Sequence, residues 1–249
     1  MTRAYQYDFS RDNPYVYDRE DRERKAKTML AVLRELVADP LDDLDVLHVG
    51  SSAGAIDHFL AAHVNRVVTI DIDKPAVAHA RRTFSQDNLE FLVADALNVP
   101  FAAASFDVVI CAHVYEHVSD ARQMLKEVIR VLRSGGVCYF AAGNRLTWNE
   151  PHYNLPLLSV LPRSLAHWYI RLAGDAEHYH EKHLSYWGLK RLVAGFVTSD
   201  VTVRLIDEPE RFDTTYMLPP GSWKARLARF VAHRAYWLLP GYIWLLKKP

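Results

Sequence analysis

The sequence predicts a doubly wound α/β fold, in which a seven-stranded, mostly parallel sheet carries helices on both faces and its last strand runs antiparallel. Apolar strand-like runs alternate with helical patterns between residues 45 and 143. Acidic residues close two of these runs, and the alternation breaks after Gly143 before it resumes near residue 186. The chain has 249 residues, half of them hydrophobic, which is enough for one large core, so we expect a single domain over 1–249.

The elements follow in order from the hydrophobic periodicity. Residues 1–18 look irregular, and a helix that begins near Arg19 and ends before Pro40 completes an N-terminal helical lid over 1–40. In the core, over 45–143, Asp120 or Ser119 can cap the start of the last helix, and Gly135-Gly136 end it. The strands expected in the core are 45–50, 66–71, 89–94, 106–112 and 136–142, and the helices are 54–62, 74–84 and 120–133.

Residues 144–183 are too irregular for another strand–helix unit and too apolar for a linker. They contain several prolines and many aromatic side chains, so we interpret them as a cap inserted over the site. The C-terminal part, 184–249, returns to the sheet and its helices. Its expected elements are a helix over 186–195, a strand near 200–206, a helix over 222–238 and a terminal strand over 242–247.

Charge and cysteine content narrow the functional class. The net charge is zero, so nothing in the bulk charge favours nucleic acid as a partner. Residues 214–249 carry six Lys or Arg and no Asp or Glu, so this tail is +6 and the remainder is −6. Cys111 and Cys138 lie in apolar strand-like runs, which predicts buried free thiols. The first residues are charged rather than apolar, and we therefore expect a cytoplasmic protein.

A small-residue turn, Gly50-Ser51-Ser52-Ala53-Gly54, separates the first strand from the first core helix. Asp71 ends the second strand about 20 residues beyond the glycines, the distance at which nucleotide-binding folds carry a ribose-binding acid. Asp95 ends the third strand in the same way. The carboxyl ends of parallel strands meet at one edge of the sheet, so these residues should line one site.

The ordered motifs resemble class I S-adenosylmethionine (SAM) dependent methyltransferases of the small-molecule, type 11-like kind. The resemblance covers residues 45–142. The segments that carry it are Leu47-His48-Val49-Gly50-x-Ser52-x-Gly54, Ile70-Asp71-Ile72-Asp73, Ala94-Asp95-Ala96, Pro100-Phe101 through Asp107, Glu116-His117-Val118 and Val131 through Gly136.

This resemblance implies SAM as the cofactor. In it, Asp71 would accept hydrogen bonds from both ribose hydroxyls, since a carboxylate offers two acceptor oxygens. Asp95 would accept from the adenine amino group, and the Ala112–His113 backbone would meet the methionine amino group. The residues that the resemblance assigns to the cofactor are Gly50, Ser52, Gly54, Asp71, Ile72, Asp95, Ala96, Ala112 and His113.

Two positions depart from the family pattern. His48 stands where the family usually has an acid, and Ser52 stands where it usually has glycine. We interpret His48 as a hydrogen-bonded interior residue. The serine hydroxyl would replace a water molecule or crowd the cofactor.

Histidines are the candidate catalysts, because a hydroxyl acceptor benefits from a base whose pKa is near neutrality. His117 and His183 are the preferred candidates, with His113 as a third. Either a base or a solvated cluster would account for His178, His180 and His183. We expect no metal site there, because one short segment seldom closes a metal site by itself.

The expected reaction is O-methylation of a saccharide, a glycolipid or another small-molecule hydroxyl, by a looser resemblance to enzymes of bacterial polysaccharide pathways.

Two basic, aromatic-rich stretches, 161–172 and 222–238, either pack on the sheet or contact an anionic membrane. Three alternatives stay open: an N- or C-methyltransferase of a natural product, a non-catalytic SAM-fold module favoured by His48 and Ser52, and an NAD(P) oxidoreductase. The last would need a longer Gly-x-Gly-x-x-Gly turn than Gly50–Gly54.

Overall fold

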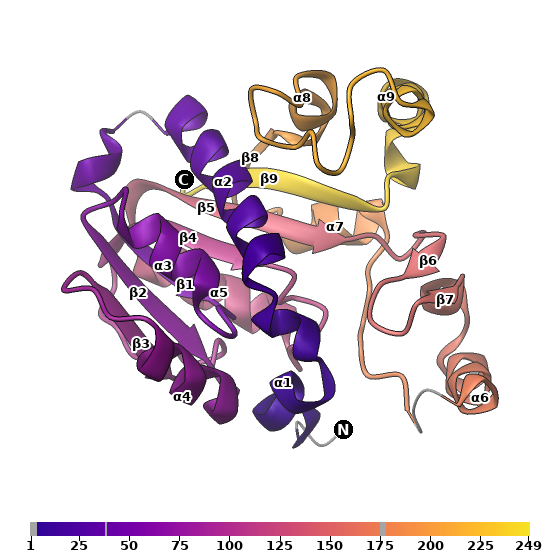
Figure 1. The fold of residues 1–249 in the computed structure, drawn as a ribbon, viewed down its shortest axis with the longest axis horizontal. Coiled ribbons are helices and arrows are strands. Elements are labelled where there is room, and N and C mark those ends of the chain that lie inside the picture. Colours follow the sequence, from indigo (N-terminus) through magenta and orange to yellow (C-terminus); the bar gives the residue numbers. More distant parts are fainter. Residues whose placement is uncertain (1–3, 38, 175–177) are drawn as a thin grey trace.

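A computed structural model describes residues 4–37, 39–174 and 178–249. Residues 1–3 and 38 of the expected lid and 175–177 of the expected cap lie outside the described residues. The described chain forms a seven-stranded sheet in the order β3-β2-β1-β4-β5-β9-β8 (Figure 1). Its strands are β1 (Asp45–Val49), β2 (Arg66–Asp71), β3 (Leu89–Val93), β4 (Phe106–Ala112), β5 (Leu132–Gly143), β8 (Val197–Asp200) and β9 (Gly241–Lys247).

The five strands β1 to β5 pair in parallel, and β9 runs antiparallel to both β5 and β8. The predicted fold class and the antiparallel last strand are therefore confirmed. The α-helices of the described chain are α1 (Phe9–Asp12), α2 (Arg19–Leu36), α3 (Ala55–Ala61), α4 (Lys74–Thr83), α5 (Ala121–Val131), α6 (Arg163–Ala173), α7 (Tyr186–Leu192), α8 (Thr202–Asp207) and α9 (Trp223–Arg234).

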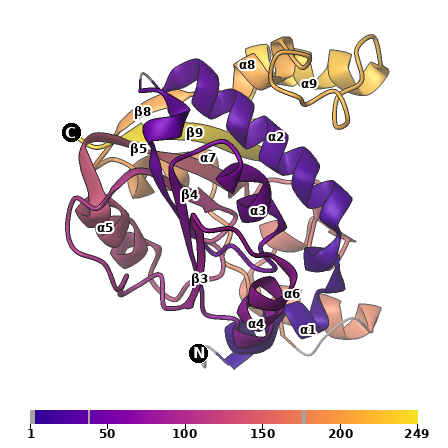
Figure 2. The ribbon, with the colours of Figure 1, turned by 60° about the vertical axis from the view of Figure 1, so that its left-hand side comes forward.

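Apolar side chains on both faces of the sheet form two hydrophobic clusters. One face packs against α5 and α7, through residues such as Met124 and Leu189. The other face packs against α2, α3 and α8, through residues such as Leu33, Leu60 and Leu205. Figure 2 shows α2 and α3 together on one side of the sheet and α5 apart from them. Strands buried on both faces explain why the sequence reads as continuous apolar runs rather than alternating ones.

The strand expected near 200–206 is wrong. The strand is β8, which ends at Asp200, and the residues that follow form helix α8. Asp200 Oδ1 accepts a hydrogen bond from the backbone N–H of Thr202 at 2.9 Å, which turns the chain out of the sheet. Leu205 and Ile206 of α8 are buried in the two hydrophobic clusters, so packing outweighs the strand preference of the β-branched residues.

Other parts of the chain also differ from the sequence prediction. Helix α5 does not extend to the glycine pair: it ends at Val131, and Leu132 already pairs with Phe106 in the sheet, so Gly135 and its neighbour lie inside β5. The expected helix over 222–238 ends at Arg234 and gives way to a 3₁₀ turn over Tyr236–Leu238. The irregular N-terminus contains short helical turns, Ala4–Asp8, α1 and Pro14–Tyr17.

The segment after β5 lies beyond the carboxyl ends of the strands. It contains a short hairpin, β6 (Asn149–Glu150) and β7 (Leu155–Pro156), followed by α6, to the right of the sheet in Figure 1. A small core of its own joins Leu158, Ala166, Ile170 and Tyr179. Hydrogen bonds from Lys182 N–H to Glu116 O (2.9 Å) and from Arg145 N–H to Leu184 O (2.9 Å) return its end to the sheet. The segment and the N-terminal turns thus frame the same edge.

Candidate functional site

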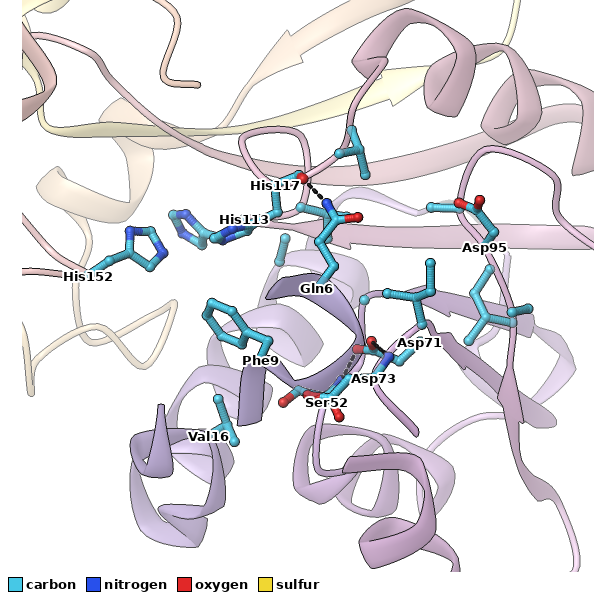
Figure 3. A pocket seen from close by; sticks show the side chains of 18 of the residues that line it. Gln6, Phe9, Val16, Ser52, Asp71, Asp73, Asp95, His113, His117 and His152 are labelled. Carbon is cyan, nitrogen blue, oxygen red and sulfur yellow. Dashed lines mark hydrogen bonds between the residues drawn. The ribbon is translucent and has the colours of Figure 1, made fainter. Parts of the chain in front are cut away.

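A cavity of about 440 Å³ opens at the carboxyl ends of β1, β2 and β4. Its size falls within the range of sites that bind small molecules and cofactors. One end carries carboxylates and small residues, and the other carries imidazole rings (Figure 3). Its walls include Gln6, Phe9, Tyr15, Gly50, Ser52, Asp71, Ile72, Asp73, Asp95, Ala96, Ala112, His113, Val114, His117 and His152.

The turn after β1 has the left-handed backbone that glycine favours at three positions. Gly50 (φ +73°) leaves no room for a side chain, because an added Cβ would lie 2.6 Å from Val114 Cγ2. Ser52 (φ +57°) keeps the same conformation despite its side chain. Gly54 (φ +83°) precedes α3, where an added Cβ would lie 2.6 Å from the Phe91 ring. Gly54 therefore supports the turn from behind and is not among the residues that line the cavity.

Asp71 holds this turn in place. Its Oδ2 accepts a hydrogen bond from the backbone N–H of Ser52 at 2.7 Å, and its Oδ1 accepts one from the N–H of Asp73 at 2.9 Å. Burial raises the pKa of the Asp71 carboxyl, against the lowering effect of these two N–H groups. Each carboxylate oxygen keeps a second lone pair, so Asp71 can still accept two hydroxyl groups from the cavity.

Asp95 and Gln6 line other walls of the cavity. Asp95 Oδ1 accepts a hydrogen bond from Leu97 N–H at 2.9 Å, which orients the carboxylate just after β3. Gln6, from the N-terminal turns, donates a side-chain hydrogen bond to the carbonyl oxygen of His117 and so joins the two ends (Figure 3). The sequence predicts a lid here but gives no motif for Gln6.

Beneath the turn, His48 is buried and paired. Its Nδ1 lies 2.6 Å from Asp57 Oδ1, and both side chains are almost inaccessible to solvent. The interpretation of His48 as a hydrogen-bonded interior residue is therefore confirmed. Its partner, Asp57 on α3, does not line the cavity, and no pattern in the sequence singles it out.

His113 lies where β4 leaves the sheet. Its backbone is left-handed (φ +57°), and its N–H donates to Ala141 O at 2.9 Å. The imidazole is 61% exposed, and its Nδ1 lies 3.4 Å from Oε1 of the buried Glu116. Burial would raise the pKa of Glu116, but His113 and the histidines around it lower that pKa to about 2. Glu116 is therefore a carboxylate that faces the inner side of His113.

Glu150 organises the histidines at the far end. Its Oε1 lies 2.7 Å from His152 Nδ1 and 3.1 Å from His183 Nε2. Its Oε2 accepts hydrogen bonds from the backbone N–H groups of His152 (2.8 Å) and Tyr153 (2.9 Å). Burial would lower the pKa of His152, but the hydrogen bond and the charge of Glu150 raise it.

His117 completes this end of the cavity. Its ring centroid lies 4.9 Å from that of His152, and its Nδ1 lies 3.9 Å from Glu181 Oε1. Burial lowers the pKa of His117 to about 4, so the ring is neutral at pH 7. Burial also raises the pKa of the Glu181 carboxyl.

The structure brings most of the predicted site residues together. Of the cofactor set, all but Gly54 line the cavity, and so do the candidate catalysts His113 and His117. His183 is not among the lining residues: it is buried behind His152 against Glu150. Sequence reasoning missed Glu150 and His152, which stand in a proline-rich stretch without a recognisable motif.

Part of this chain is similar to known methyltransferases. Residues 47–140 match the family model of a methyltransferase domain. A probable SAM-dependent methyltransferase of Mycobacterium tuberculosis is 33% identical over 121 residues, 49% of this chain and 43% of that protein. A ubiquinone biosynthesis O-methyltransferase of Psychrobacter arcticus is 29% identical over 164 residues, 63% of this chain and 60% of that protein. A SAM-dependent methyltransferase structure from Mesorhizobium loti superposes with a TM-score of 0.59 at 14% identity, covering 89% of this chain and 98% of that one.

Proposed function

We propose that this chain, whose residues 47–140 form a class I SAM-dependent methyltransferase domain, methylates a hydroxyl group of a saccharide or glycolipid. The family match confirms the resemblance from which SAM was expected as the cofactor. The chain spans less than half the length of the Mycobacterium relative, so the activity of the whole protein is our proposal.

The carboxylate end of the cavity fits SAM. Asp71 keeps two free acceptor lone pairs, which suit the two hydroxyls of a ribose. Ile72 offers an apolar wall for adenine and Asp95 an acceptor for its amino group, while the Ala112–His113 backbone would meet the methionine end. SAM supplies a methyl group already activated on a sulfonium, so positioning provides much of the rate.

One observation carries the choice of a hydroxyl acceptor: imidazole rings lie at the other end of the same cavity. A hydroxyl must lose its proton as it is methylated, and a positioned base accelerates such a transfer by about 10²- to 10⁴-fold. His113 is the accessible ring, and the Glu116 carboxylate 3.4 Å from its Nδ1 would stabilise the protonated ring. We assign His113 the role of proton acceptor, with His117 beside it.

The test is transfer of labelled methyl from SAM to pathway sugars and lipid-linked glycans, with His113→Asn as the key variant. Asparagine tolerates the left-handed backbone of residue 113, so the turn should survive. We expect kcat to fall by about 100-fold or more while SAM affinity stays within about threefold of the unmodified chain. His79 on α4 is half-buried and does not line the cavity, so His79→Asn provides the control variant. Unchanged turnover in His113→Asn would exclude this base.

Exposed aromatic faces support a lipid-linked acceptor. Leu165, Trp168 and Leu172 on α6 are exposed, and so are Trp223, Leu227 and Phe230 on α9, where Trp223 is 68% accessible. The interpretation that these faces pack on the sheet is wrong for these six side chains, because α6 buries only Ala166 and Ile170 and α9 only Ala225 and Ala232. Figure 1 shows both helices at the same edge of the molecule.

We infer that this edge rests on an anionic membrane surface. The tail that contains α9 carries six basic and no acidic residues, and exposed Lys224 and Arg226 flank its aromatic side chains. In the described ranges, no helix has the length and apolarity needed to cross a bilayer. Contact would therefore be peripheral.

Vesicle flotation tests this surface. The chain should float with vesicles rich in phosphatidylglycerol and not with neutral phosphatidylcholine vesicles. Trp223→Ser with Phe230→Ser should abolish flotation, and Arg226→Glu should weaken it. Val197→Ser, an exposed apolar position on β8, serves as the control. If the α9 variants float as well as the unmodified chain does, or if nothing floats, the membrane surface is excluded.

Two other functions give different results in the same assays. A non-catalytic module would bind SAM and transfer no methyl group to any acceptor. Its sequence support, His48 and Ser52, is weakened because His48 pairs with Asp57 and Ser52 keeps the glycine-like backbone. An N- or C-methyltransferase would label amine or carbon acceptors and leave the sugars unlabelled.

A further inference from the structure

Seven titratable side chains gather at the histidine end, from three segments far apart in the sequence. They come from the loop after β4, from the hairpin region and from the chain before α7, and they include His113, Glu116, His117, Glu150, His152, Glu181 and His183. Two overlapping groups of them could hold a metal ion: His117, His152 and Glu181, and Glu150, His152 and His183.

This cluster holds three buried glutamates, which is unusual for a protein interior. Glu116, Glu150 and Glu181 are each at most 4% exposed. Among the described residues, no lysine or arginine forms an ion pair with any of them, and the basic side chains beside them are histidines. Buried carboxylates normally pair with a cation or coordinate a metal.

The hydrogen bonds of the two groups distinguish them. Glu150 already accepts at both oxygens, from two imidazoles and two backbone N–H groups, which fills the roughly four lone-pair sites of a carboxylate. Glu181 Oε2, by contrast, is buried and has no hydrogen-bond partner among the described residues. Glu181 therefore has the free ligand capacity and Glu150 does not.

We propose that His117, His152 and Glu181 bind a divalent cation of the zinc class, with Glu150 orienting His152 from behind. The three ligand atoms lie within 4.8 Å of one another, so small side-chain rotations bring them to the 2.0–2.2 Å bonds that zinc makes with imidazole and carboxylate. Two histidines and one glutamate with an open position form a ligand set of catalytic zinc sites.

Glu150 has the geometry of a carboxylate behind a metal-binding histidine. It engages Nδ1 of His152 at 2.7 Å, which leaves Nε2 as the ligand atom and fixes the tautomer. His183 holds the other side of Glu150 at 3.1 Å. The sequence expectation of no metal site considered only the segment around His183, and the ligands proposed here come from three segments.

The open position of this site would face the cavity, because His117 and His152 both line it. There the cation would bind the acceptor hydroxyl oxygen and lower its pKa. The hydroxyl proton passes to His113, and an O–CH₃ bond forms as the S–CH₃ bond breaks and leaves its electron pair on sulfur. The cation keeps its oxidation state. This role rests on the proposed function, whereas cation binding itself does not.

Metal titration of the full chain tests the site. After treatment with a chelator and desalting, the chain is titrated with Zn²⁺ by calorimetry and with Co²⁺ by visible absorption. We expect saturation at one cation per chain, and a loss of affinity of at least about 10-fold in His152→Ala and in the nearly isosteric Glu181→Gln. Glu150→Gln should weaken binding by about 10- to 100-fold without removing a ligand.

A histidine outside the cluster provides the matched control: His178→Ala should bind as the unmodified chain does. Thermal unfolding of each variant shows whether it is folded. The inference is overturned if the unmodified chain shows no saturable binding, or if folded His152→Ala and Glu181→Gln bind as tightly as His178→Ala. A parallel SAM titration separates the two proposals, because a chain that binds SAM and no cation contradicts only the metal site.

Discussion

The two ends of the cavity are built in opposite ways. The carboxylate end, to which we assign SAM and which we call the cofactor end, consists mostly of backbone turns at the ends of β1, β2 and β4. One side chain, Asp71, holds these turns through two backbone N–H groups. The histidine end consists of side chains that hold one another, as Glu150 holds His152 and His183. A site of the first kind has its geometry set by the fold, whereas a site of the second kind depends on each member of its network.

This difference predicts that a substitution at one end of the cavity leaves the function of the other end largely unchanged. The cofactor end should tolerate changes among the histidines, because within the described parts of the chain no hydrogen bond joins Asp71 or Ser52 to the histidine end. The histidine end should tolerate loss of SAM affinity in the same way.

The largest effect is expected for Asp71→Ala. Two hydrogen bonds from ribose hydroxyls to a charged acceptor are lost, each worth about 1.5–3 kcal/mol, so the SAM dissociation constant should rise by about 100-fold or more. Calorimetry with SAM measures it. His152→Ala should bind SAM within about threefold of the unmodified chain, and comparable losses in both variants would contradict the separation of the two ends.

The same difference explains what the sequence could predict. The motifs of the cofactor end are contiguous, so Gly50, Asp71 and Asp95 could be recognised one by one and assigned to one edge of a parallel sheet. The histidine end has no contiguous motif. Glu150 and His152 reach it because the chain after β5 folds back, with Lys182 N–H bonded to Glu116 O and Leu184 N–H bonded to the Tyr115 hydroxyl. No local pattern encodes these contacts.

The fold was predictable for a related reason. Periodicity and the spacing of turns identified the strands β1 to β5 and β9, most of which carry apolar runs buried in the sheet. The prediction from periodicity failed at β8 and α8. Val201, Val203 and Ile206 have a high strand preference, but packing places this segment in a helix. The prediction also failed after α5, because Leu132 joins the sheet before the glycines are reached.

Breaking the buried pair of His48 and Asp57 should lower the stability of the fold more than it lowers the rate of methyl transfer. In His48→Ala the Asp57 carboxylate, fully buried on α3, loses its partner, so unfolding by urea should show a loss of about 2–3 kcal/mol. A cycle with Asp57→Ala and the double variant isolates the pair. Additive losses in that cycle would mean that the two side chains do not stabilise each other.

SAM affinity should depend on pH through Asp71. Its carboxylate accepts the ribose hydroxyls when ionised, so binding is complete above its pKa and weakens as the pH falls through it. Because burial raises that pKa, the weakening should begin at a higher pH than for an ordinary aspartate, with a slope of about tenfold, or 1.4 kcal/mol, per pH unit below it. Asp71→Asn should give a flatter profile, and an equally steep profile in that variant would assign the titration to another group.

The smallest effect is expected for Ser52→Gly, which tests whether the cofactor end depends on backbone alone. A left-handed conformation costs a residue with a side chain about 1–2 kcal/mol, and glycine gives back about 0.5–1 kcal/mol through its more flexible unfolded state. The difference of these ranges predicts a variant that is about 0–1.5 kcal/mol more stable in urea unfolding. SAM affinity should change little, because the N–H group that bonds Asp71 belongs to the backbone. If affinity instead falls by tenfold or more, the serine hydroxyl contacts the cofactor, and this end too relies on a side chain absent from the family pattern.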